Sequence, residues 1–90
     1  MLTRQPDATI HIDRVYVDRV YSRATKRQGT NRHEITVHRF EDATERLSLD
    51  TVSDWMASLC ERALAASLPV VVTWHESAYG YDLISVAVDA

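Results

Sequence analysis

Apolar residues recur along the middle of the chain at steps of three and four, which is the spacing of one helix face. We expect the helix to begin at Asp50, which can cap its first turn, and to end at Leu68. Pro69 stops it, because proline supplies no N–H and disfavours helix in the residue before it. The apolar stripe consists of Val52, Trp55, Met56, Leu59, Cys60, Ala63 and Leu64.

Alternating or β-branched apolar residues on both sides of this helix predict five strands, over residues 9–21, 33–40, 47–50, 69–75 and 81–88. In the first strand Ile10 and Ile12 fall on one parity, Val15 and Val17 on the other, and Val20 on the first again. Such slips are typical of a long strand with a bulge. Helical spacing competes there, and we reject it because nearly all the apolar residues are β-branched or aromatic. The predicted core contains Trp55, Leu59, Leu64, Val70, Val72 and Trp74.

The order strand, strand, strand, helix, strand, strand resembles the OB-fold, a five-stranded, partly open barrel. Residues 17–29, Val-Asp-Arg-Val-Tyr-Ser-Arg-Ala-Thr-Lys-Arg-Gln-Gly, resemble the bent first strand and following loop of such domains. Residues 72–83, Val-Thr-Trp-His-Glu-Ser-Ala-Tyr-Gly-Tyr-Asp-Leu, resemble their closing hairpin. We therefore expect residues 1–90 to form a small single-domain, β-rich α+β protein, an OB-like barrel with residues 1–8 flexible. The alternative is one helix packed on an open antiparallel sheet.

The composition is typical of a globular protein, with 46% apolar and 26% charged residues. The single cysteine, Cys60, cannot form an internal disulfide, and its place on the helix stripe predicts a buried small hydrophobe. No apolar run approaches the roughly 18 residues that cross a membrane. The first residues also lack the hydrophobic segment of a signal peptide. We expect a cytoplasmic protein without membrane contact.

No residue pattern predicts catalysis, a metal site or a cofactor. The four histidines and Cys60 lack the paired spacing of structural zinc sites. No serine lies in the glycine-flanked turn of a nucleophile elbow. Gly29 and Gly80 are isolated, so neither belongs to a phosphate-binding loop. We therefore expect a non-enzymatic binding protein.

Charge is divided unevenly along the chain, although the net charge is only −3. Residues 1–39 contain eight Lys or Arg and four Asp or Glu, a net of +4, whereas residues 40–90 contain two and nine, a net of −7. This division is consistent with a basic binding face and an acidic back. It is equally consistent with two neighbouring halves that neutralise each other.

The basic segment 22–32 is the main indication of function. The OB-fold resemblance implies that a ligand binds on the second and third strands between two loops, here 22–31 and 76–81. Cations beside aromatic rings suit single-stranded DNA or RNA. The predicted nucleic-acid-binding residues are Arg23, Lys26, Arg27, Arg32, His38, Tyr79 and Tyr81.

A protein partner is the alternative. A compact acidic domain with exposed strand edges suits an inhibitor or adaptor of the kind that phages encode, directed at a nucleic-acid-handling or defence complex. Glu41, Asp42 and Glu45 would then meet a basic groove on that partner. The pattern leaves the oligomeric state open.

Overall fold

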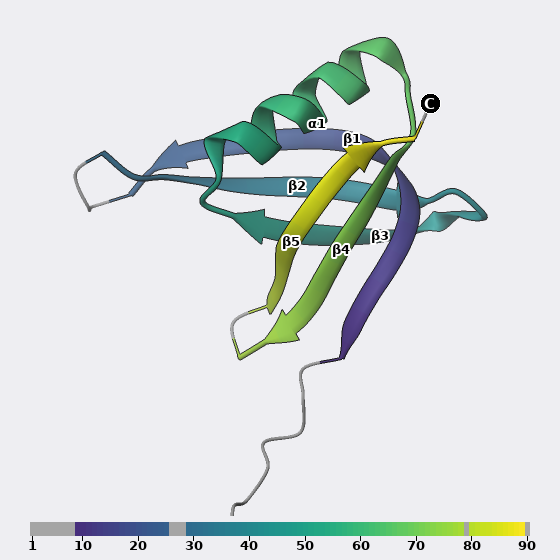
Figure 1. The fold of residues 1–90 in the computed structure, drawn as a ribbon, viewed down its shortest axis with the longest axis horizontal. Helices are drawn as coiled ribbons and strands as arrows, with labels where there is room; N and C mark the ends of the chain where they lie inside the picture. Colours follow the sequence, from purple (N-terminus) through teal and green to yellow (C-terminus); the bar gives the residue numbers. More distant parts are fainter. Residues whose placement is uncertain (1–8, 26–28, 79, 90) are drawn as a thin grey trace, which may run out of the picture.

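The computed structural model describes residues 9–25, 29–78 and 80–89, and the predicted flexible segment 1–8 lies outside them. This part of the chain forms five strands and one helix. Figure 1 shows how they are arranged. In chain order they are β1 (Ile10–Ala24), β2 (Asn31–Arg39), β3 (Asp42–Thr51), α1 (Asp54–Ala66), β4 (Val70–Ser77) and β5 (Gly80–Val88).

The strands form a closed barrel in the order β1-β2-β3-β5-β4, and β1 also pairs with β4. Every pairing is antiparallel except that of β3 with β5, where Leu49 is opposite Tyr81 and Asp50 is opposite Asp82. The helix connects β3 to β4. This is the predicted OB-like layout, and the open-sheet alternative is wrong.

The long bent strand β1 closes the barrel because it serves two neighbours (Figure 1). Residues 10–15 pair with β4, and residues 15–24 pair with β2. The register of the β1–β2 pair shifts between Val17 and Arg19, which confirms the bulge predicted from the sequence. The extra residue returns Val20 to the side of the sheet on which Val15 and Val17 are buried.

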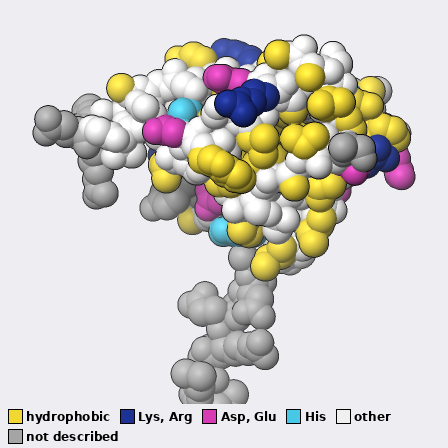
Figure 2. Space-filling model, turned by 45° about the horizontal axis from the view of Figure 1, so that its top comes forward, with side chains coloured by type: hydrophobic (Ala, Val, Ile, Leu, Met, Phe, Trp, Pro, Cys, Tyr) yellow, Lys and Arg dark blue, Asp and Glu magenta, His cyan; other side chains and the backbone are white. Residues whose placement is uncertain are grey.

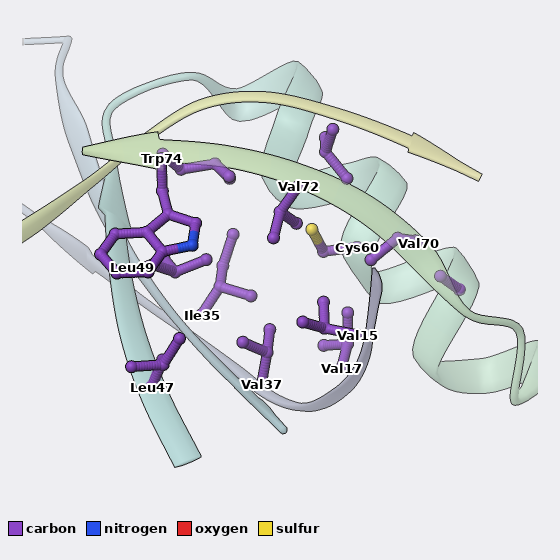
Figure 3. Close-up of a cluster of buried hydrophobic side chains, with 13 residues drawn as sticks. Val15, Val17, Ile35, Val37, Leu47, Leu49, Cys60, Val70, Val72 and Trp74 are labelled. Atoms are coloured by element: carbon purple, nitrogen blue, oxygen red, sulfur yellow. The ribbon is translucent and has the colours of Figure 1, made fainter. Parts of the chain in front are cut away.

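The barrel interior is filled by side chains from all five strands, which point toward one another in Figure 3. Val70, Val72 and Trp74 belong to this core as predicted. The indole Nε1 of Trp74 donates a hydrogen bond of 2.9 Å to Asp13 Oδ2. The buried cluster consists of Val15, Val17, Ile35, Val37, Leu47, Leu49, Cys60, Ala63, Val70, Val72, Trp74, Leu83 and Val86.

The helix covers the core with small side chains, which corrects part of the predicted core. Its buried residues are Ala57, Cys60 and Ala63, whereas Trp55 is 67% exposed and Leu64 is 38% exposed. Leu59 is partly buried against the cluster. The side chains that the helix buries fully are thus small, and the larger apolar side chains of the predicted stripe are partly buried or exposed.

The helix is shorter at both ends than the predicted range, Asp50 to Leu68. Ser53 rather than Asp50 is the N-cap, and its Oγ accepts a hydrogen bond from the Met56 N–H at 3.2 Å. At the other end Ser67 adopts the left-handed conformation, with φ 55° and ψ 38°. The N–H of Leu68 then donates to the Ala63 carbonyl at 2.9 Å, which closes the last turn before the proline.

The strands β1, β2 and β3 extend beyond the ranges predicted from apolar alternation. Residues 22–24, 31–32 and 42–46 are all exposed, so no apolar period marks them. Backbone pairing alone defines these ends, and the pairing of β1 with β2 continues to Ala24 opposite Asn31. The predicted basic loop 22–32 is consequently reduced to the connection between two paired strands. In the described part of the chain, no helix has the length and apolar character needed to span a membrane.

Candidate nucleic-acid interface

The outer side of the β1–β2 pair carries a concentrated group of arginines. Because the β1 bulge resets the alternation, Arg19, Tyr21 and Arg23 share one side of the strand, with Val20 on the other. Tyr21 lies opposite Glu34, and Arg23 lies opposite Arg32 on β2. We call Arg19, Tyr21, Arg23 and Arg32 the arginine face.

The three arginines of this face have no carboxylate partner within the described residues. Arg19 instead places its guanidinium carbon 5.1 Å from the centre of the Tyr21 ring, and Tyr21 is 47% exposed. Arginines elsewhere on the barrel are paired: Arg14 with Asp89, Arg39 with Glu45, and Arg46 with Asp18. The arginine face therefore offers cations that an anion can reach without displacing a protein carboxylate.

The structure brings together only part of the predicted site. Arg23 and Arg32 are directly opposed on the arginine face. His38 lies farther along β2, where its Nδ1 is 2.7 Å from Asp18 Oδ1. Tyr81 is partly buried and packs edge-on against Trp74, with 4.9 Å between ring centroids. The predicted residues Lys26, Arg27 and Tyr79 lie outside the described residues.

Arg19 and Tyr21 were not among the predicted residues, although the sequence contains a signal for them. The triplet Arg-Val-Tyr occurs at 14–16 and again at 19–21. A spacing of five would place the two triplets on opposite sides of an unbroken strand. The bulge between them compensates, so Val15 and Val20 both face the barrel interior, and both tyrosines lie on the outer side.

Aromatic side chains also lie on the outer side of the β1–β2 pair toward the bend of β1. Tyr16 stacks on His38 with 5.6 Å between centroids and on Phe40 with 5.5 Å. The Arg14 guanidinium carbon lies 4.2 Å from the centre of the Phe40 ring. Because Tyr16 already stacks on two rings, Tyr21 has the more accessible ring for a ligand.

Two adjoining grooves border the arginine face. One, of about 440 Å³, is lined by Arg23, Arg32, Glu34 and Asp50. The other, of about 350 Å³, shares Arg32 and Asp50 and continues between β3, β5 and the start of α1. Its remaining lining residues are Thr51, Val52, Ser53, Met56, Asp82 and Leu83.

A chain of polar contacts anchors the β1–β2 hairpin to the helix start. Ser22 Oγ lies 2.6 Å from His33 Nδ1, and His33 Nε2 lies 2.7 Å from Asp54 Oδ1. With the proton on Nε2, the ring donates to Asp54 and accepts from the Ser22 hydroxyl. Hydrolase triads contain the same residue types, but there serine pairs with Nε2 and aspartate with Nδ1. Since His33 is buried and Ser22 lines neither groove, we interpret the contacts as structural.

Reactive groups of other kinds are scarce over the described ranges. No cluster of three or more His, Cys, Asp or Glu side chains there is arranged to hold a metal ion. Cys60 is fully buried, as the sequence predicted. Burial raises the pKa of its thiol to about 11, with a smaller contribution from the charge of Glu61, so little thiolate forms near neutral pH.

The fold and this surface define a class: an OB-like barrel with an exposed arginine face on its first hairpin. Comparisons with protein-family models, with curated proteins and with solved structures give no match for this chain.

Proposed function

We propose that this protein binds single-stranded nucleic acid on the arginine face and catalyses no reaction. The observation that carries the proposal is a set of three arginines near the exposed ring of Tyr21, none of which has a carboxylate partner in the part of the chain that the structure describes. Arginine contacts to phosphates release counterions and give affinity without sequence information. An exposed aromatic ring adds stacking on a base.

The accessible ring favours a single strand over a duplex. Bases in a duplex are stacked on each other, and their flat faces are hidden, whereas a single strand can place a base on an aromatic side chain. Arg19 and Arg23 are four residues apart on β1, roughly 13 Å at the rise of a strand. Tyr21 lies between them. A base on that ring would therefore have phosphates within reach of cations on both sides.

The acidic net charge does not oppose this proposal, because the local field decides where a polyanion binds. Part of the basic first half is neutralised by the acidic second half, through the pairs Arg14–Asp89 and Arg39–Glu45. The arginine face is the part of the basic half for which no such pairing occurs among the described residues.

A salt titration tests the proposal. Fluorescence anisotropy would measure the affinity of a labelled 12-nucleotide single strand at several salt concentrations. Replacing both Arg23 and Arg32 by Gln should weaken binding and flatten the slope of log affinity against log salt by about 1.4, at about 0.7 per lost phosphate contact. Arg62→Gln, on the exposed side of α1, is the matched control and should leave the slope unchanged. A wild type that does not bind at low salt would refute the proposal.

A protein partner is a second candidate function, which the apolar surface of the helix side favours. Figure 2 turns this side forward, and hydrophobic side chains occupy much of it. Trp55 is 67% exposed and Val52 is 62% exposed. Exposed tryptophans are enriched among residues that dominate binding energy at interfaces. This candidate keeps the inhibitor or adaptor role but moves its contact surface to the helix.

Two of the three acidic residues that the sequence assigns to a partner, Asp42 and Glu45, are engaged locally. Glu45 pairs with Arg39, and Asp42 Oδ1 accepts hydrogen bonds from the hydroxyl and the N–H of Thr44. These two hydrogen bonds lower the pKa of Asp42. A nuclease-treated pull-down from a host lysate, with wild type and Trp55→Ala, tests the second candidate. A specific protein retained by the wild type and lost in the variant would support it, and equal recovery would refute it.

A further inference from the structure

The two grooves beside the arginine face share Arg32 and Asp50, and together they form one depression with three kinds of chemistry. Arg23 and Arg32 supply cations, and Glu34 and Asp50 supply carboxylates. The second groove adds apolar side chains, among them Val52, Met56 and Leu83. It also contains a further carboxylate, Asp82, whose Oδ2 lies 3.8 Å from His75 Nε2.

This combination of groups matches the parts of a ribonucleotide. Phosphate requires cations, the sugar hydroxyls require hydrogen-bond acceptors, and the base requires an apolar surface. We infer that the depression binds one nucleotide of an RNA strand, with its phosphate at Arg23 and Arg32 and its 2′-hydroxyl at Glu34 or Asp50. The inference rests on the proposed function and names its substrate class.

The two carboxylates distinguish RNA from DNA. Ionised carboxylates only accept hydrogen bonds, and a 2′-hydroxyl can donate one. Neither carboxylate forms an ion pair within the described residues, so both retain acceptor capacity. Deoxyribose has no donor at that position. A DNA strand would therefore meet two negative charges beside its phosphates with no hydrogen bond to offset the repulsion.

The space is sufficient for this ligand. The grooves measure about 440 and 350 Å³, and each lies within the range of small-ligand sites. Gly80 lies beside Asp50, and its φ of 142° is a conformation that side chains rarely adopt.

The test compares three 12-nucleotide strands of one sequence built from A and C only: RNA, DNA and 2′-O-methyl RNA. Anisotropy titrations with the wild type should show RNA binding at least about tenfold more tightly than DNA, the value of one charge-assisted hydrogen bond. The 2′-O-methyl strand lacks the donor and should bind no better than DNA.

Removal of the carboxylates should abolish the preference for RNA. In Glu34→Ala/Asp50→Ala the repulsion is removed for both strands, so DNA should gain affinity. RNA also loses its hydrogen bond, so the ratio of RNA affinity to DNA affinity should fall to about one. Glu61→Ala, an exposed carboxylate on the helix, is the control for net charge and should leave the RNA-to-DNA ratio unchanged. Circular dichroism would establish that each variant is folded.

Equal wild-type affinity for RNA and DNA would overturn the inference while the proposed function stands. The same holds if the 2′-O-methyl strand binds as tightly as RNA, or if the double variant keeps the full preference for RNA. A wild type that binds none of the strands would remove the proposed function and the inference with it.

Discussion

Arg23 and Arg32 lie directly opposite each other across the β1–β2 pair, and neither has a carboxylate partner among the described residues. Like charges that face each other across a sheet destabilise it. An anion between them would remove that repulsion. The repulsion between the two arginines thus destabilises the free protein slightly, and a bound phosphate would offset this destabilisation.

Removal of one of these charges should have different effects on the stability of the protein and on its affinity for a single strand. Arg32→Gln should leave the free energy of unfolding unchanged or raise it by about 0.2–1 kcal/mol, because the repulsion disappears. The same variant should bind a single strand more weakly. Urea denaturation and anisotropy would measure the two effects. A clear loss of stability would mean that Arg32 makes a favourable contact in the fold.

Tyr21 and Tyr81 should respond differently to truncation. Tyr21→Ala should weaken binding by about 1–3 kcal/mol with the salt slope unchanged, because it removes stacking and no charge. Its effect on folding should be small, since the ring is 47% exposed. Tyr81→Ala should instead lower the free energy of unfolding by about 1–3 kcal/mol through its lost contact with Trp74. The reverse result would place the stacking ring at residue 81.

Truncation of the two tryptophans should affect the stability of the fold to different extents. Trp74→Ala should cost about 3–5 kcal/mol of stability, because Trp74 is 3% exposed and its removal leaves a cavity and takes the hydrogen-bond donor from Asp13 Oδ2. Trp55→Ala should change stability by no more than about 0.5 kcal/mol. Chemical denaturation followed by circular dichroism checks both values. Equal losses would mean that the helix packs through Trp55 after all.

Alkaline pH should destabilise the fold through Cys60. Its pKa is raised from 9.0 to about 11 in the folded protein, so the unfolded chain releases the thiol proton first. The contribution to stability is complete below pH 9 and is lost as the pH rises to about 11, a change on the order of 2 kcal/mol. Denaturation of wild type and Cys60→Ala between pH 8 and about 11 tests this. The variant should show the shallower decline, and parallel curves would contradict the assignment.

Much of the fold follows from local pattern, and the misses have physical causes. The bulge in β1 was visible as a slip in valine spacing, and the strand order around the helix predicted the barrel. The predicted helix stripe is right at Cys60 and Ala63, which are buried, and wrong at Trp55, which is 67% exposed. The side chains that the helix buries fully are small. Periodicity identifies a stripe but does not show how closely it packs.

The candidate site was predicted in part for a similar reason. Arg23 and Arg32 were recognisable from charge alone. To predict Arg19 and Tyr21, one must know on which side of β1 each residue lies. That side depends on the position of the bulge within the paired strands. The OB-fold resemblance assigns Tyr81 to a ligand because it lies in the second of the two ligand loops, but Tyr81 packs against Trp74 in the structure.

The most direct test of the central claim is the salt dependence of single-strand binding by wild type and by Arg23→Gln/Arg32→Gln. Anisotropy titrations of one labelled RNA 12-mer at several salt concentrations give both slopes. Tight wild-type binding at low salt, with a slope that becomes shallower by about 1.4 in the variant, is the result predicted here. Identical slopes and affinities for the two proteins would contradict a nucleic-acid site on the arginine face.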